Sequence, residues 1–205
     1  NIDPFNIKAI GLHGQTIMHH TQTNFPGSLQ IGDSALVAKE TGIPVVSNFR
    51  NNDIASGGEG APFAPLFHSW LFSNKKVNRI LINIGGVSNI SLLLKNGNYK
   101  GYDIGPGNIL MDSWSIANKK GDFDHKGQWA MTGNVNDQLL NEFKKDVFFK
   151  RNPPKSTGTD YFNLKWVKEK ISTNNKSIAS TDVQATLAEL TVDIILNSIK
   201  EYPKE

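Results

Sequence analysis

The middle of the chain alternates short apolar runs with turn residues. The apolar runs cover residues 79–86, 89–97 and 99–105, and Gly or Asn residues punctuate them. Short runs that are rich in Ile and Leu and bounded in this way predict β-strands. The Asn96-Gly97 pair is typical of a tight hairpin turn. We therefore predict three successive strands, with a hairpin turn between the last two.

Apolar residues at helical spacing dominate the last third of the chain. Residues 180–200 repeat apolar positions every three or four residues, which predicts a helix with one buried face. Thr181 and Gln184 have the spacing of an N-terminal capping box. Residues 134–149 predict a second helix in the same way. The apolar stripes consist of Val183, Leu187, Leu190, Ile194 and Ile195 in one helix and of Leu139, Leu140, Phe143 and Val147 in the other.

The first third of the chain carries shorter signals. Ser34 can cap a short helix that Gly42 ends. Three glycines between residues 53 and 62 predict a loop. The remaining expected elements are a buried strand that leads into a polar loop over residues 7–19, a turn-rich connector over 25–33, a strand over 43–49, a helix over 63–72 and a loop over 152–162.

Strands followed by helices indicate a layered α/β or α+β fold. The polar stretch 75–78 is the predicted boundary between two lobes, residues 1–75 and 76–205. A chain of 205 residues accommodates one large domain or two small ones. It has no cysteine, which excludes disulfides, zinc–thiolate sites and a cysteine nucleophile.

Charge and hydropathy argue against two classes of partner. The net charge is +3, and the lysines are scattered rather than clustered with aromatic residues, so we expect no nucleic-acid binding. No apolar run approaches the roughly 20 residues that span a bilayer, so we expect no membrane insertion.

Two polar stretches near the N-terminus could contact a ligand. Residues 12–16, Leu-His-Gly-Gln-Thr, offer hydrogen-bonding side chains suited to a hydroxyl-rich ligand such as a sugar. The same side chains could instead satisfy the backbone of their own loop. In residues 48–62, Arg50 and Asp53 precede several glycines. An arginine can grip a carboxylate or phosphate, although an exposed Arg–Asp pair is the simpler alternative.

Two glycine turns follow predicted strands. Gly85-Gly86 can present backbone N–H groups to a phosphate, but an ordinary hairpin bend explains it equally well. The stretch 101–114, Gly-Tyr-Asp-Ile-Gly-Pro-Gly-Asn-Ile-Leu-Met-Asp-Ser-Trp, places Asp103 before a turn that opens a helix near Ile109. Because a helix N-terminus favours anions, Asp103 lies where a general base beside a phosphate could be. It could also be a carboxylate that accepts backbone bonds in its own turn.

Other chemistries find less support. The histidines show no spacing typical of metal ligands, so we expect no transition-metal site. No Gly-x-Ser-x-Gly elbow occurs, which argues against a serine hydrolase.

Considered together, these stretches resemble the anhydro-N-acetylmuramic acid kinase family over nearly the whole chain. The matching stretches occur in order and are far more specific jointly than singly. They are residues 11–16, 29–33, 49–62, 81–93, 101–114, 153–163 and 182–191.

The resemblance implies an actin-like, hexokinase-type (ribonuclease H-like) two-lobed α/β fold. It implies a cytoplasmic enzyme that opens the 1,6-anhydro ring of a cell-wall sugar with water and phosphorylates O6 from ATP with Mg²⁺, in peptidoglycan recycling. The implied partners are the anhydro amino sugar and ATP, with neither nucleic acid nor membrane, and a homodimer is compatible with it.

The resemblance also implies roles for individual residues. Asp103 matches the general base that activates the attacking water. The phosphate-binding or ATP-binding residues would be Gly85, Gly86, Gly105, Gly107 and Asn108. The sugar-binding residues would be His13, Gln15, Thr16, Arg50 and Asp53.

The chain departs from the family pattern in four places. The Gly-Thr-Ser-x-Asp-Gly phosphate loop does not precede Asn1, and a glycine-rich nucleotide segment does not follow the last helix. Asn51 and Asn52 replace expected arginines, and Glu59 stands in place of glutamine. We therefore expect a central segment, incomplete at both ends and inactive alone. The alternatives are an ATP-independent anhydro-sugar hydrolase, which would need two facing carboxylates, and a non-catalytic sugar-binding module.

Overall fold

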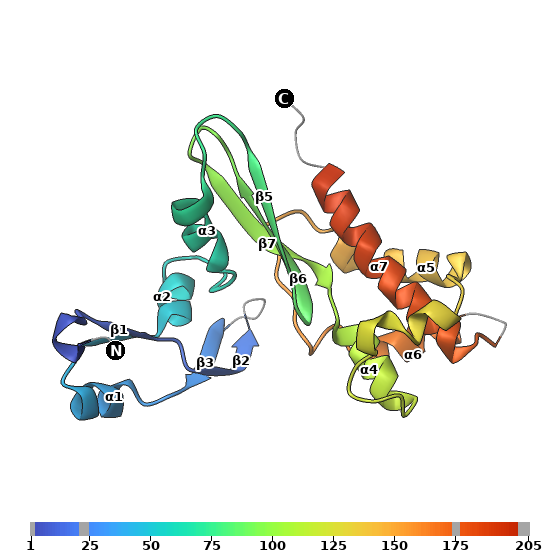
Figure 1. Cartoon of the computed structure of the whole chain (residues 1–205), viewed down its shortest axis with the longest axis horizontal. Helices are drawn as coiled ribbons and strands as arrows, with labels where there is room; N and C mark the ends of the chain where they lie inside the picture. Colours follow the sequence, from blue (N-terminus) through green and yellow to red (C-terminus); the bar gives the residue numbers. More distant parts are fainter. Residues whose placement is uncertain (1–2, 21–24, 174–176, 201–205) are drawn as a thin grey trace. The chain divides into compact units, whose positions relative to one another are not determined.

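The computed structural model describes residues 3–20, 25–173 and 177–200. The chain divides into two compact units, Asn1–Phe63 and Ala64–Glu205. Each unit has its own β-structure and its own helices, so the fold is mixed α/β, as predicted (Figure 1).

Two small sheets form the first unit. β1 (Ile10–Leu12) pairs in parallel with β4 (Val45–Ser47), which confirms the two predicted strands in shorter form. The first was predicted to be buried, which is wrong, because Gly11 is exposed and its two neighbours are only half-buried. β2 (Gln15–His20) pairs antiparallel with β3 (Gly27–Ile31). The polar loop predicted after the first strand is therefore wrong beyond Gly14, because the chain continues there as a second strand.

The turn-rich connector predicted over residues 25–33 is also wrong, because it contains β3. Asn51 explains why this polar segment is extended. Its side-chain amide accepts a bond from the Ser28 N–H and donates one to the Ser28 carbonyl, both at 2.8 Å. An amide side chain therefore satisfies β3 on the side where a further strand would bind.

Two short helices complete the first unit. α1 (Ser34–Thr41) confirms the predicted helix and ends at Gly42, whose φ of 70° is left-handed. Asp33, rather than Ser34, caps it by accepting the Leu36 N–H at 2.9 Å. α2 (Phe49–Ala55) includes Asp53, so the loop predicted over residues 53–62 begins only after this helix.

A three-stranded antiparallel sheet begins the second unit. β5 (Arg79–Ile84), β6 (Val87–Leu93) and β7 (Tyr99–Pro106) lie in that order and confirm the three predicted strands. α3 (Ala64–Phe72), also predicted, packs against β6 and β7. A Cβ on Gly101 would lie 1.9 Å from Pro65 Cγ, so only glycine permits this approach. The lobe boundary at residue 75 stays a prediction. The compact units divide earlier because α3 packs on the sheet of the second unit.

Helices pack together after the sheet, and α7 also packs against β7 (Figure 1). α7 (Ser180–Lys200) has the predicted bounds. The other helical elements are η1 (Pro4–Asn6) in the first unit, and α4 (Ile109–Ala117), η2 (His125–Gly127), η3 (Ala130–Thr132), α5 (Asp137–Lys144), η4 (Val147–Lys150) and α6 (Leu164–Ser172) in the second. Their buried core consists of Leu110, Leu139, Leu140, Phe143, Phe148, Phe162, Trp166, Val167, Val183, Leu187, Leu190 and Ile194.

Two details of the helical predictions are wrong. Val147 belongs to η4 and is 66% exposed, because the chain leaves the α-helix after Lys144. The capping box is not formed, because Thr181 already lies inside α7. Gln184 is fully buried, and its side-chain amide has no hydrogen-bond partner among the described residues.

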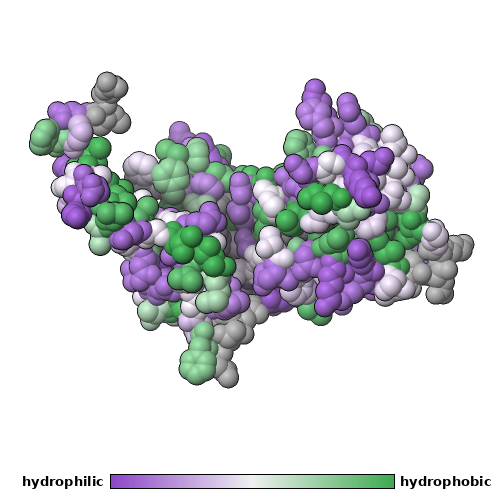
Figure 2. Space-filling view, turned by 90° about the horizontal axis from the view of Figure 1, so that it is seen from below, coloured by the Kyte–Doolittle hydropathy of each residue, from purple (hydrophilic) through white to green (hydrophobic). Residues whose placement is uncertain are grey.

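The surface combines hydrophilic and hydrophobic patches on the face drawn in Figure 2. Large apolar side chains on α3 are well exposed, namely Leu66, Phe67, Trp70 and Leu71. Among the described residues, no helix is both long and apolar enough to cross a membrane.

Candidate active site

Asp103 lies within β7, opposite Asn89 of β6, and is only 8% exposed. Its backbone N–H donates to the Lys155 carbonyl at 3.0 Å. Its Oδ2 accepts the Thr157 N–H, also at 3.0 Å. A buried carboxylate must be hydrogen-bonded, and a loop that is distant in sequence supplies these bonds. The bond from Thr157 to its side chain is therefore a tertiary contact.

The two glycine turns are bonded to one another. The N–H groups of Gly107 and Ile109 donate to the Gly86 carbonyl at 2.9 and 3.2 Å, and the Asn108 N–H donates to Gly85 at 2.8 Å. These bonds bring together four of the five residues expected at phosphate, and the fifth, Gly105, lies in β7 opposite Ser88. These three N–H groups are already used, so a phosphate in this conformation would need other donors of the two turns.

Close packing explains two of these glycines. A Cβ on Gly107 would lie 2.2 Å from the Gly85 carbonyl oxygen. Gly105 has a φ of 145°, and a Cβ there would lie 2.8 Å from side-chain atoms of Phe149 and Ile194. α7 also supports the turn, because the Thr191 hydroxyl donates to the Gly107 carbonyl at 3.0 Å. The turn is therefore held by β-structure on one side and by a helix on another.

Further polar groups lie along these turns. Gly86 is exposed, and a Cβ built there would make an ordinary van der Waals contact with Ile109, at 3.8 Å. Asn108 is exposed and makes no capping bond. Burial raises the pKa of Asp112, in the first turn of α4.

In the first unit, Arg50 and Asp53 hold the same glycine. Arg50 Nη1 donates to the Gly60 carbonyl at 2.7 Å, and Asp53 Oδ2 accepts the Gly60 N–H at 2.7 Å. Arg50 Nε also donates to His13 Nε2 at 2.9 Å. His13 must therefore carry its proton on Nδ1, which lies 2.8 Å from the Gly14 carbonyl. Three of the expected sugar-binding residues are thus connected.

The other two expected sugar-binding residues lie on β2. Gln15 is exposed, while Thr16 Oγ1 accepts a bond from Gln30 Nε2 at 3.3 Å. A cavity of about 170 Å³ is lined by His13 and by neighbouring polar residues of β3, β4 and α2. The lining residues are Leu12, His13, Gly14, Ser28, Leu29, Gln30, Gly32, Ser47, Asn48 and Asn51.

His19 and Glu59 are two further titratable residues of the first unit. Burial and the Arg50 charge lower the pKa of His19, whose Nδ1 lies 3.0 Å from Ser28 Oγ. The carboxylate oxygen Oε2 of Glu59 is buried without a hydrogen-bond partner in the described part of the chain. Neutral or unsatisfied groups of this kind suit recognition of polar ligands.

Asp103 and the His13 group belong to different units. Sequence reasoning missed Lys155 and Thr157, the residues whose backbone contacts Asp103. The sequence pointed to them only because they lie in residues 153–163, one of the stretches that resemble the family. No local pattern relates them to Asp103.

The second unit therefore has the features of an enzyme site: a buried carboxylate within β7, shortly before the glycine turn that leads into α4. Sequence comparison identifies the family. The profile of anhydro-N-acetylmuramic acid kinase matches residues 1–205, and the chain belongs to this family.

Three relatives illustrate the match, all named anhydro-N-acetylmuramic acid kinase. The protein of Aliivibrio fischeri is 46% identical over 98% of this chain and 54% of its own length. The Photobacterium profundum protein is 44% identical, with 98% and 53% coverage. The Haemophilus influenzae protein is 44% identical, with 97% and 54% coverage. The chain thus spans about half the length of the curated relatives it matches.

Proposed function

We propose that the protein carrying this chain is an ATP-dependent sugar kinase of peptidoglycan recycling. Its substrate would be 1,6-anhydro-N-acetylmuramic acid and its product N-acetylmuramic acid 6-phosphate, formed in the cytoplasm. The observation that supports this most is family membership over all 205 residues, together with the buried Asp103 beside the glycine turns. The proposed fold is the actin-like, hexokinase-type two-lobed fold.

Asp103 would act as the general base. It would take a proton from water as the water oxygen forms a bond to C1 of the sugar, while the bond between C1 and O6 breaks. The freed O6 would take the γ-phosphoryl group of ATP, as the bond between the γ-phosphorus and the β–γ bridging oxygen breaks and ADP leaves. A carboxylate held by a backbone N–H has a defined orientation, which general-base catalysis requires.

The glycine turns would lie beside the phosphates. We propose contacts from Gly85, Gly86, Gly105, Gly107 and Asn108, in which Gly86 and Asn108 are the exposed members. Mg²⁺ usually binds through substrate phosphates and only one or two carboxylates. We propose that it would enter with ATP.

On the sugar side, we propose His13, Gln15 and Thr16 as contacts to hydroxyl or amide groups. Arg50 and Asp53 would contribute by holding the loop at Gly60 and, through Arg50, the tautomer of His13. In this conformation both ring nitrogens of His13 already have partners, Gly14 and Arg50, so a sugar would hydrogen-bond to His13 by replacing one of them.

The test is the reaction itself, in a full-length protein that carries these residues. The anhydro sugar is incubated with and without ATP and Mg²⁺, and the products are separated by mass spectrometry. We expect the 6-phosphate only when ATP is present. Ring opening without ATP would favour a hydrolase, and binding without turnover would favour a sugar-binding module.

A further inference from the structure

A loop that lies far along the chain holds the carboxylate of Asp103. The Lys155 carbonyl accepts the Asp103 N–H, and the Thr157 N–H donates to Asp103 Oδ2, 54 positions away in sequence. One bond fixes the strand and the other fixes the side chain. Residues 155–157 therefore act on both, and we refer to them as the clamp.

The Lys155 side chain anchors the clamp to η4. Lys155 is 9% exposed, which is costly for an ammonium group unless it has polar partners. Its Nζ donates to the Phe148 carbonyl at 3.3 Å and lies 4.8 Å from the centre of the Phe148 ring. Such a cation–π contact stabilises a desolvated ammonium.

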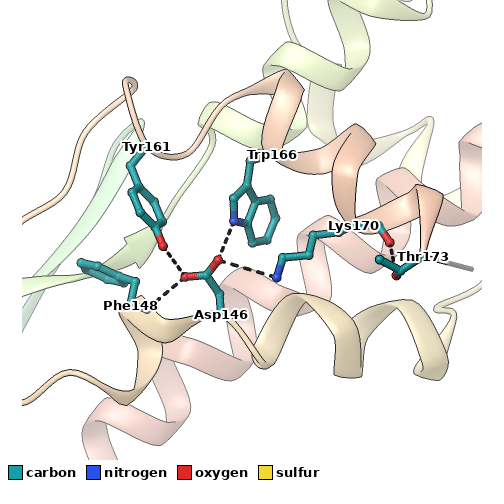
Figure 3. Close-up of polar contacts among 6 residues, drawn as sticks. All are labelled: Asp146, Phe148, Tyr161, Trp166, Lys170 and Thr173. Atoms are coloured by element: carbon teal, nitrogen blue, oxygen red, sulfur yellow. Dashed lines mark hydrogen bonds and ion pairs between the residues drawn. The ribbon is translucent and has the colours of Figure 1, made fainter.

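Phe148 is fixed in turn by Asp146. The Phe148 N–H and the Tyr161 hydroxyl both donate to Asp146 Oδ1, at 2.9 and 2.7 Å. Trp166 Nε1 donates to Oδ2 at 2.8 Å, and Lys170 Nζ lies 3.7 Å from the same oxygen. Figure 3 shows these four groups converging on one carboxylate. Asp146 thus connects η4, which precedes the clamp, to Tyr161 and α6, which follow it.

The pKa shifts of Asp146 and Tyr161 are consistent with the hydrogen bonds between them. Burial alone would raise the pKa of Asp146, but the bonds from Phe148, Trp166 and Tyr161 and the charge of Lys170 lower it overall. Asp146 is therefore ionised at neutral pH. Burial and the bond to Asp146 raise the pKa of Tyr161 to about 12, so its hydroxyl remains a donor.

We propose that the clamp orients the Asp103 carboxylate for its role as base, and that Lys155 and Asp146 are positioning residues for that carboxylate. This inference rests on the proposed function. Neither residue touches the substrate in this scheme. Each acts through the clamp, since loss of either frees the loop that bonds to Oδ2.

The test uses steady-state kinetics of the full-length protein with the anhydro sugar, ATP and Mg²⁺. K155M keeps the aliphatic stem of Lys155 but removes the ammonium. Its control is K150M, an exposed lysine of η4. Y161F removes one bond to Asp146, and its control is Y99F, since Tyr99 and Tyr161 are similarly exposed at 43% and 38%.

We expect K155M to lower kcat about 10- to 100-fold, because a small misplacement of a catalytic group has effects of this size. KM for both substrates should stay near the wild-type value, and Y161F should give a smaller fall in kcat. The two controls should resemble wild type. A wild-type kcat in K155M would overturn the proposal, whether KM is unchanged or raised. If K155M does not fold, Y161F decides by the same criteria.

D103N separates this inference from the proposed function. Full activity of D103N would contradict the role of Asp103 as the base. The proposal that the clamp orients Asp103 would then fail as well. An inactive D103N beside a fully active K155M would overturn the clamp alone.

Discussion

Replacing Asp146 by asparagine should destabilise the second unit. The Asp146 side chain accepts hydrogen bonds from three groups and pairs with Lys170. Asparagine keeps one acceptor oxygen, which can serve Phe148 and Tyr161. Its NH₂ group would face the Trp166 N–H, so this bond is lost and Lys170 loses its carboxylate. A hydrogen bond to a charged group contributes about 1.5–3 kcal/mol, so the free energy of unfolding should fall by about 3 kcal/mol.

The effect should depend on pH in a defined direction. The pKa of Asp146 is below its ordinary value of 3.8 in the folded protein. Its ionised form therefore stabilises the fold fully above that value, and this contribution is lost as the pH falls through the lowered pKa. The difference between wild type and D146N should be complete at pH 7 and should shrink below about pH 4.

The assay is thermal unfolding followed by circular dichroism between pH 3 and pH 7. A loss of 3 kcal/mol corresponds to a fall in Tm of about 6–12 °C in a domain of this size. D122N, at an exposed aspartate of the same unit, is the matched control. An unchanged Tm of D146N at pH 7, or a difference that grows toward pH 3, would refute this reasoning.

Three further predictions concern the turns and the first unit. G107A should separate the two glycine turns, because its Cβ would lie 2.2 Å from the Gly85 oxygen; a loss of about 1–3 kcal/mol in urea unfolding is expected, whereas G27A, with open space around it, should be neutral. N51A should speed amide exchange at Ser28, whose N–H it leaves without the Asn51 acceptor; unchanged protection there would contradict the assigned bond. R50M should let the second tautomer of His13 appear in ¹⁵N NMR spectra, because Arg50 no longer donates to Nε2; a single Nδ1–H tautomer in the variant would count against this.

The sequence predicted the helices and strands that carry a long periodic pattern of apolar residues. α7 and the three strands β5 to β7 were predictable because long periodic runs mark them. β3 was not, because Gly27, Ser28 and Gln30 are polar or flexible, and the Asn51 bonds that satisfy Ser28 come from a distant helix. The cap of α1 was misplaced by one residue, since Asp33 and Ser34 are both good caps.

In the candidate site, too, local features were predictable and long-range contacts were not. The turn at Gly105 and Gly107 and the carboxylate before it were visible in the sequence. The clamp was not, because the contact between Thr157 and Asp103 exists only after the chain has folded back over 54 positions. Arg50 and Asp53 were expected to contact a ligand, and that role stays a prediction. The structure adds that both bind Gly60.

The most direct test of the central claim is turnover by D103N in a full-length protein that carries this chain. Phosphate transfer to the anhydro sugar is followed by ³¹P NMR, and sugar binding is measured separately by calorimetry. The account predicts that D103N binds the sugar with near wild-type affinity but forms no 6-phosphate, while D122N is fully active. Turnover by D103N at the wild-type rate would contradict it.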